Sequence, residues 1–514
     1  MEKKILALLN DLISINSTSH SKQEKEIEGF LYNEFKNINY FMEHTNYFGT
    51  VAIPNDPFER EAVYAFVKGK TAKTVILMNH HDTVGLAEYG SLAPYALDSR
   101  QLLLQLLEHE TSEDVLQDLR SGEWMVGRGC CDMKGGIAVQ IALLEEYAKD
   151  PDRGSLLFLS LPDEESFSAG MRGVLPFLEN WKKRWHLEYI LAINSEPCPK
   201  RNEKLVVSVG SVGKLLPVVL IQGKSVQIGN YQKGLNPLAL LAKLVDYTEG
   251  NPSMIDTCKS ERTVPPAWSF VRDLKKTYDF SLPMRAAGYC NILTFYRTPE
   301  NVMDDFLSLC RNAVEDISKR LGAFENIPVM TYGELLATAK ERSGFDLFFG
   351  QQKLELRERI QVEGGNFPDV TVDMMQAVLD FVGVQEPVII IGFAPPYYPA
   401  VNSVKLGGDH FKRILDKAAK QEPMVFDQYF LGVSDCSYCG LDGPVNTWVY
   451  ESNTPLWGSL YKFDFTIVSK LAIPFMLLGP WGKDLHCRTE RVHVSHITKF
   501  LPRTIAEVVD FAWQ

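Results

Sequence analysis

Four short apolar segments in this sequence each end in carboxylate or imidazole side chains, and no other feature limits the possible folds as strongly. The first segment, "TVILMNHHD", ends in His80, His81 and Asp82. The other three lead into "PDEES", into "NSEP" and, through a Gly-Pro loop, into the histidine of "KDLHC". Continuous apolar segments of this length are typical of the buried strands of a parallel sheet.

Helical patterns separate these segments, for example at residues 134–150 and 169–185. Strands that alternate with helices predict right-handed crossovers and an α/β sheet with helices on both faces. Ligands of such sheets bind beyond the carboxyl ends of the strands. The acidic and imidazole side chains are therefore expected to meet at one edge of the sheet, where they could hold a metal ion.

His80 and Asp82 are the first candidate pair. Residues two apart in a strand point to the same side, so His80 and Asp82 share a face and His81 points away. His80 can ligate a metal ion. Asp82 can accept a hydrogen bond from the imidazole ring and so fix its orientation. A polar loop without a metal ion is the alternative explanation of this pair.

Asp132 is the next candidate, in the segment "GRGCCDMKGG". The glycines on both sides of it allow the backbone a tight path and a close approach to a ligand. Asp132 also stands where a helix N-cap is expected, and capping is its alternative role.

Glu164 and Glu165 are adjacent carboxylates after an apolar segment, and like charges at a buried site oppose each other's ionisation. A metal ion beside one of them relieves this repulsion, so Glu165 is the candidate ligand and Glu164 the candidate base for a water proton. The alternative is an exposed acidic loop. Near the C-terminus we expect His486 to be a ligand, rather than His493 or His496, because it lies nearest to the end of its strand.

Composition limits the classes of function. The 514 residues carry a net charge of −12, which argues against nucleic acid as a partner because a polyanion would be repelled. No segment approaches the roughly 18 consecutive apolar residues of a membrane helix, so no membrane partner is expected. Residues 1–17 predict an amphipathic helix rather than a signal peptide. Nine irregularly spaced cysteines fit free thiols in a reducing compartment, and we expect a cytoplasmic protein.

In chain order, "NHHDTV", "GRGCCDMKGG", "DEES", "SEP" and "HCRTERV" are similar to the five signature regions of the M20 family of co-catalytic zinc metallopeptidases and amidohydrolases. The resemblance spans nearly the whole chain. Three further segments, "GYCNILTFYRTPENV", "IIIGFAPPYYPAVN" and "YFLGVSDCSY", most resemble the arginine-utilisation (RocB-type) branch of the family. The branch resemblance suggests a link to arginine or amino-acid catabolism.

The resemblance implies two divalent metal ions, zinc in this family, and it names their ligands. The matching positions are His80, Asp132, Glu165, Glu196 and His486. Asp132 is expected to bridge the two ions, with His80 and Glu196 on one side and Glu165 and His486 on the other.

The resemblance also implies the catalytic residues and the reaction. Glu164 looks like the general base and Asp82 like the carboxylate behind His80, and the Asp132–Met133 peptide bond is expected to be cis. The implied reaction is hydrolysis of an amide or peptide bond in a small substrate, such as a dipeptide or an N-acyl amino acid.

Members of the family carry a smaller β-α-β-β-α-β domain inserted into the catalytic domain. Matching patterns predict this α+β lid at residues 213–334, between catalytic segments 1–212 and 335–514. The catalytic sheet, mixed and mostly parallel, is expected to resume with the strand at "EPVIIIGF". Pairing between lids is common in the family, so a homodimer through the lid is expected, which would also cover an open strand edge.

Three residues are candidates for substrate binding. Gln227 stands where the family's lid signature has an oxyanion-stabilising histidine; its amide can still donate a hydrogen bond but carries no charge. This departure supports an alternative function, a catalytically attenuated or silent member that binds metal and a small ligand. Arg297 either binds a substrate carboxylate through its guanidinium group or is a surface arginine at a strand end. Asp435 has either a structural role or a role in the substrate pocket.

Overall fold

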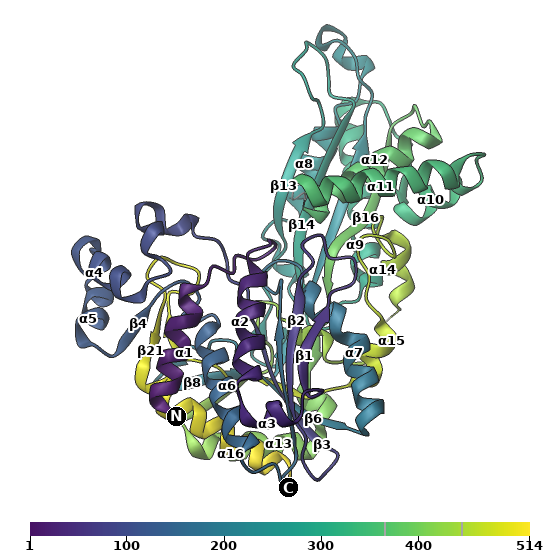
Figure 1. Ribbon diagram of the computed structural model, residues 1–514. Helices are drawn as coiled ribbons and strands as arrows, with labels where there is room; N and C mark the ends of the chain where they lie inside the picture. The colour runs from purple at the N-terminus through teal and green to yellow at the C-terminus, as the bar shows by residue number, and fades with distance from the viewer. Residues whose placement is uncertain (364–365, 444–445) are drawn as a thin grey trace. The chain divides into compact units, whose positions relative to one another are not determined.

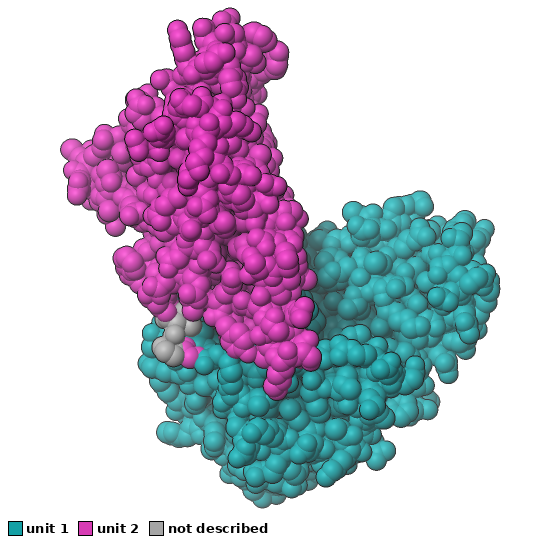
Figure 2. All heavy atoms as spheres, turned by 180° about the vertical axis from the view of Figure 1, so that it is seen from behind, with its two compact units in different colours: residues 1–211, 401–442, 463–514 teal, residues 212–400, 443–462 magenta. Residues whose placement is uncertain are grey.

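The computed structural model of the chain describes residues 1–363, 366–443 and 446–514 and divides into two compact units, coloured separately in Figure 2. Unit 1 comprises Met1–Ser211, Val401–Asp442 and Phe463–Gln514, and unit 2 comprises Val212–Ala400 and Gly443–Lys462. Unit 2 is therefore inserted into the chain of unit 1. Within the described ranges, no helix combines the length and the apolar character that crossing a membrane requires.

Unit 1 is built on a nine-stranded mixed sheet whose central strands are parallel (Figure 1). The strands follow the order β1-β2-β5-β3-β6-β19-β8-β18, and β7 pairs with β8. In that order their bounds are Phe48–Ala52, Glu61–Val67, Ser155–Leu161, Lys73–His80, Glu188–Asn194, Phe475–Leu477, Lys204–Ser208 and Met424–Asp427, with β7 at Lys200–Arg201.

The four apolar segments that the sequence predicts as strands are β5, β3, β6 and β19, and they are neighbours in this sheet. β3 pairs in parallel with both β5 and β6, and β6 pairs in parallel with β19. Their carboxyl ends therefore meet at one edge. The predicted α/β sheet, mixed and mostly parallel, is confirmed.

Helices cover both faces of the sheet, as the burial of β3 shows. Val75 and Leu77 pack into a core cluster that includes residues of α1, α2, α6, α13 and α16, whereas Ile76 and Met78, pointing the other way, are equally buried. Burying one such side chain stabilises the fold by about 1.5–3 kcal/mol. On the second face α7 packs against β2. The helices of unit 1 are α1 Glu2–Ser14, α2 Glu24–Lys36, α3 Asn39–Glu43, α4 Ser99–His109, α5 Glu113–Ser121, α6 Lys134–Ala148, α7 Ala169–Trp185, α13 Ser403–Gln421, α15 Phe465–Leu471 and α16 Leu501–Ala512.

A small three-stranded sheet carries the C-terminal candidate ligand. It joins β20 (Gly482–Lys483), β21 (Arg491–His493) and β4 (Trp124–Val126), and His486 lies in the connection between β20 and β21. Asp118 of α5 accepts hydrogen bonds from Lys483 Nζ at 2.7 Å and Arg491 Nε at 2.8 Å. Helix α5 thus anchors both strands that flank the His486 loop.

Unit 2 contains a five-stranded sheet in the order β13-β14-β10-β16-β15. The strands span Ala267–Asp273, Arg285–Thr294, Gly213–Gln222, Val388–Tyr398 and Val329–Thr331. The helices of this unit are α8 Pro237–Thr248, α9 Pro299–Leu321, α10 Tyr332–Lys340, α11 Phe345–Glu363, α12 Phe367–Val382 and α14 Thr447–Asn453.

One expectation about the inserted domain is wrong. The segment "EPVIIIGF" belongs to β16, which pairs antiparallel with β10 and parallel with β15 rather than joining the catalytic sheet. Unit 2 begins at Val212, beside the predicted start at 213, but continues to Ala400 instead of ending at 334. A continuous apolar segment indicates that a strand is buried on both faces, but its pairing partner is set by contacts distant in sequence.

Candidate metal centre

The predicted ligands come from separate segments of unit 1. His80 ends β3, Asp132 precedes α6, and Glu165 follows β5. Glu196 follows β6, and His486 lies between β20 and β21. All these side chains are buried or half-buried except that of His486, which is 47% exposed.

His80 directs one ring nitrogen to a group of carboxylates. Its Nδ1 donates a hydrogen bond to the backbone carbonyl of Asp82 at 3.0 Å, which leaves Nε2 free for a metal ion. Around Nε2 lie Asp132 Oδ1 at 3.2 Å, Glu164 Oε2 at 3.9 Å and Glu196 Oε1 at 4.0 Å. The candidate ligand atoms of His80, Glu164 and Glu196 lie within 4.8 Å of one another.

Asp132 directs its two carboxylate oxygens to two different histidines. Oδ1 lies 3.2 Å from His80 Nε2, and Oδ2 lies 3.2 Å from His486 Nε2. Glu165 Oε1 lies 3.0 Å from the same His486 nitrogen, and Glu165 forms a second group of candidate ligands with His80 and Asp132. The peptide bond between Asp132 and Met133 is cis, as the resemblance implied. Asp132 therefore lies between His80 and His486.

Glu490 fixes the loop that presents Asp132, a role that sequence reasoning missed. Its Oε1 accepts the backbone N–H groups of Cys131 and Asp132 at 3.1 Å each. Its Oε2 accepts the Gly129 N–H at 3.1 Å and pairs with Arg128 Nη1 at 3.0 Å. The available signal was a glutamate inside the last signature segment, "HCRTERV", but nothing in that segment shows which backbone it binds.

Asp82 holds the loop that carries the two adjacent glutamates. Its Oδ1 accepts the backbone N–H of Glu164 and its Oδ2 that of Glu165, each at 3.1 Å. The same Oδ1 lies 3.4 Å from His80 Nδ1. The Asp82 carboxylate thus holds the Glu164–Glu165 backbone, which was not expected, and lies beside the His80 ring.

Burial and mutual repulsion shift the pKa values of the acidic groups. Burial and the charge of Glu196 raise the pKa of Glu164 well above its usual range, and burial and Asp132 do the same for Glu196. Burial opposes ionisation of Asp132 too, but hydrogen bonds from the two histidines outweigh it and lower the pKa of Asp132. Hydrogen bonds to Asp132 and Glu165 raise the pKa of His486 to about 10. The site therefore concentrates negative charge that a cation would neutralise.

The donor atoms fit divalent cations. Glu196 Oε1 is buried, and within the described part of the chain it accepts no hydrogen bond. A buried carboxylate oxygen without a donor is unfavourable, and a bound cation supplies the missing partner. Imidazole nitrogen and carboxylate oxygen are both ligands of zinc.

Asp435 and the two histidines that we did not expect to be ligands, His493 and His496, also belong to unit 1. Asp435 is buried in unit 1 at the start of a short 3₁₀ helix, where burial raises its pKa to about 7. Its charge in turn contributes to the raised pKa of Glu164. His493 stacks on Trp481 with ring centroids 4.6 Å apart, and His496 Nδ1 accepts the Trp481 backbone N–H at 2.9 Å.

Arg297 and Gln227 belong to unit 2. The Arg297 guanidinium pairs with Asp256 through Nε at 3.2 Å and with Asp305 through Nη1 at 2.7 Å. Gln227 is exposed, and its backbone forms an isolated antiparallel bridge with Ser281. Substrate binding by either residue stays a prediction.

Comparisons with known proteins give three results. The family model described as "Peptidase family M20/M25/M40" matches residues 76–501. Protein RocB of Bacillus subtilis (strain 168) is 28% identical over an alignment of 547 positions, which covers 98% of this chain and 94% of RocB. Two solved structures share the fold: aminopeptidase PepT from Bacillus cereus ATCC 10987, with 11% identity, coverage of 100% and 99% and a TM-score of 0.57, and the Bacillus subtilis YXEP protein, titled a dinuclear metal binding peptidase, with 12% identity, coverage of 99% and 97% and a TM-score of 0.50.

Proposed function

This chain belongs to peptidase family M20/M25/M40, and on that premise we propose that it hydrolyses an amide or peptide bond in a small substrate with two divalent metal ions bound. One observation carries the proposal: Asp132 offers separate carboxylate oxygens to His80 and His486. An aspartate that bridges two ions needs this arrangement. The YXEP protein, which shares the fold, is titled a dinuclear metal binding peptidase.

The two ions would share the bridging aspartate. His80 and Glu196 would complete one site, and Glu165 and His486 the other. Bound there, the ions would lower the pKa of a water molecule and polarise the scissile carbonyl. We propose zinc as the native metal, because histidine and carboxylate ligands suit it.

Glu164 is the proposed general base. Its backbone is fixed by Asp82, and its carboxylate lies 3.9 Å from His80 Nε2, beside the proposed ligands. Glu164 takes a proton from the attacking water and delivers it to the leaving amine nitrogen as the C–N bond breaks. The products are a carboxylate and an amine.

We propose a dipeptide or an N-acyl amino acid as the substrate, in arginine or amino-acid catabolism. Two observations support this substrate class and this pathway: the similarity to RocB over nearly the whole chain, and the three segments that resemble the RocB-type branch. The test combines elemental analysis with turnover across a panel of dipeptides and N-acyl amino acids. Two bound ions and release of a free amino acid are expected. Stoichiometric metal without turnover of any panel member would leave the second candidate, a silent metal- and ligand-binding member, which the exposed Gln227 favours.

We further propose a homodimer that pairs through unit 2. Strand β13 forms one edge of the five-stranded sheet, and each of its side chains is exposed or half-buried. An open strand edge is a ready site for pairing with another chain. Sedimentation velocity should show a dimer. A proline at a β13 position whose backbone N–H points away from β14 should convert the dimer to a monomer.

A further inference from the structure

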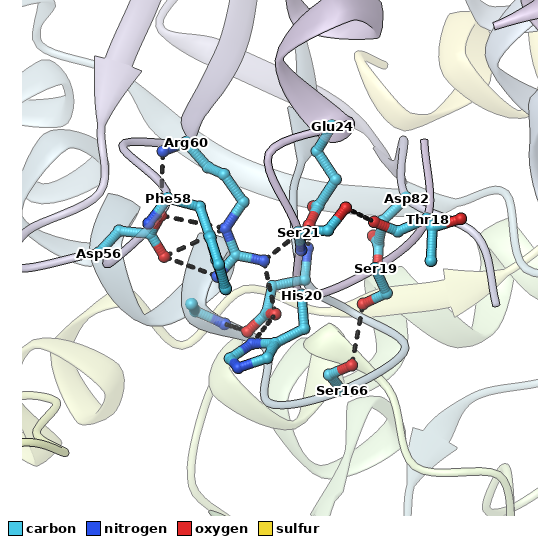
Figure 3. A network of polar contacts seen from close by, with 12 residues as sticks. Thr18, Ser19, His20, Ser21, Glu24, Asp56, Phe58, Arg60, Asp82 and Ser166 are labelled. Carbon is cyan, nitrogen blue, oxygen red and sulfur yellow. Dashed lines mark hydrogen bonds and ion pairs between the residues drawn. The ribbon is translucent and has the colours of Figure 1, made fainter. Parts of the chain in front are cut away.

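Arg60 lies buried in unit 1 among three carboxylates, none of them a proposed metal ligand. Its Nη1 donates hydrogen bonds to Glu24 Oε1 at 2.7 Å and to Asp163 Oδ1 at 2.6 Å, and its Nη2 donates to Asp56 Oδ1 at 2.6 Å. All four side chains are at most 1% exposed. Figure 3 shows the Arg60 guanidinium reaching between Asp56 and Glu24. Glu24, Asp56, Arg60 and Asp163 are called the Arg60 network below.

The network fixes both the side chain and the backbone of Asp163. While Arg60 binds Oδ1, Glu24 Oε2 accepts the Asp163 backbone N–H at 2.9 Å, and Asp163 Oδ2 accepts the Ala169 N–H at 3.1 Å. The Asp163 backbone has a φ of 69°, in the left-handed region that residues other than glycine seldom adopt. Such a conformation persists where the surroundings over-determine it, as these contacts do.

Asp163 directly precedes Glu164 and Glu165. Their backbone N–H groups are held from the other side by the Asp82 carboxylate. The pair is thus fixed between Asp82, next to the metal centre, and Asp163, next to Arg60. A rotation at Asp163 would displace the proposed base and a proposed metal ligand together.

The segment before α2, which includes Ser19 and His20, contacts the loop that carries Asp163 and Ser166. His20 Nδ1 lies 3.2 Å from Asp163 Oδ1, and the hydroxyls of Ser19 and Ser166 are 2.9 Å apart. Like this segment, Glu24 and Arg60 lie before residue 76, where the family match begins.

We propose that Arg60 and Glu24 are positioning residues for the hydrolysis: by holding Asp163 they set where Glu164 and Glu165 present their carboxylates. The inference rests on the proposed function for its kinetic consequence, but its consequence for metal binding does not depend on turnover. Neither residue touches the proposed metal ligands, so both act through Asp163: Arg60 through its side chain and Glu24 through its backbone.

The test compares Arg60→Met with Glu24→Gln. The first removes the guanidinium, and the second replaces the carboxyl group by an amide of the same shape, so it serves if Arg60→Met does not fold. Arg153→Met is the matched control, because Arg153 pairs with Asp510 at 2.9 Å on the surface of the same unit, with 48% of its side chain exposed. Zinc is titrated into the metal-free proteins against a chelating competitor, and kcat and KM are measured on the best panel substrate.

Both variants are expected to bind one of the two zinc ions, the one that Glu165 would hold, about 10–100-fold more weakly. They are also expected to lose about 10–100-fold in kcat. KM should change by less than about threefold, because Glu164 acts in the chemical step rather than in substrate binding. Arg60→Lys should recover part of the zinc affinity and part of kcat, since one ammonium group can replace Nη1 between Glu24 and Asp163. Arg153→Met should match the unmodified protein.

Folded Arg60→Met and Glu24→Gln proteins with unchanged zinc affinities would overturn the proposal, even if their melting temperatures fall, because the network would then support the fold alone. If the unmodified protein turns over no substrate, the proposed function fails. The zinc titration still decides the positioning role.

Discussion

Glu490 Oε1 accepts the backbone N–H of Asp132 at 3.1 Å, although the two residues are 358 positions apart in the chain. The contact joins the loop that presents Asp132 to the end of the β20–β21 connection that carries His486. The other carboxylate oxygen of Glu490 pairs with Arg128, and both side chains are 1% exposed. Two segments of the candidate metal centre are therefore held in one arrangement by a single buried carboxylate.

Glu490→Gln is expected to lower the free energy of unfolding by about 3–5 kcal/mol, because it leaves the buried Arg128 without a counter-ion. The amide also turns a donor toward backbone N–H groups that need an acceptor. Denaturant titration of the metal-free protein measures the loss. Arg488→Gln is the control, because the Arg488–Glu110 pair is 48% exposed on the arginine side and should contribute less than about 1 kcal/mol. Equal losses in the two variants would contradict this role.

Asp132→Ala should reduce the metal content more than Glu196→Ala does. The first change removes a ligand from both proposed ions, whereas the second removes a ligand from one. Elemental analysis of the purified proteins gives the counts, with two ions expected in the unmodified protein. An unchanged count in Asp132→Ala would exclude the bridging assignment.

Glu164→Gln should retain both metal ions and lose about 10²–10⁴-fold in kcat, the range of general acid–base catalysis. An amide cannot accept the water proton, although it preserves the shape of the side chain and the backbone contact with Asp82. Metal analysis and steady-state kinetics on one preparation separate the two effects. Retained activity would place the base elsewhere.

Gln227→Ala and Gln227→His test whether the lid residue still acts in catalysis. If the Gln227 amide donates to the developing oxyanion, alanine should lower kcat by about 10²–10³-fold, and histidine, which can carry charge, should raise it. Single-turnover rates at saturating substrate measure both. No effect of either change at an otherwise active site would mean that Gln227 has no part in the reaction.

Glu28 should make stability depend on pH. Burial raises its pKa to about 7, with the hydrogen bond from the Glu61 N–H only partly opposing it. Because the folded-state pKa lies above the unfolded value, the contribution of Glu28 to stability is complete below about pH 4.3 and is lost as pH rises through 7, by about 3 kcal/mol.

Glu28→Gln should therefore flatten the stability curve between about pH 4 and 7, since a glutamine does not titrate over that range. Its amide oxygen can still accept the Glu61 N–H. Urea titrations at several pH values compare the two proteins. Parallel curves would show that Glu28 ionises without penalty in the folded state.

The sequence determined which chemical groups meet in this protein. Parallel strands bring their carboxyl ends to one edge, so a strand that ends in His80 and another that leads into Glu164 and Glu165 had to place these groups near each other once the strands were neighbours. The period of two along a strand likewise put His80 and Asp82 on one face. These inferences need only local geometry, which a short segment carries within itself.

Tertiary structure decided how those groups are held. The apolar segment of β16 fits any buried strand position, and only its pairing with β10 assigns it to unit 2. The carboxylate of Glu490 reads in sequence as a polar residue near a histidine, and Arg60 as an ordinary arginine before a strand. Each acquires its role from backbone N–H groups or carboxylates that the folded chain brings to it from more than a hundred positions away. Such contacts leave no local pattern, because the physical requirement they meet, a partner for every buried charge, can be satisfied by any segment that the fold places there.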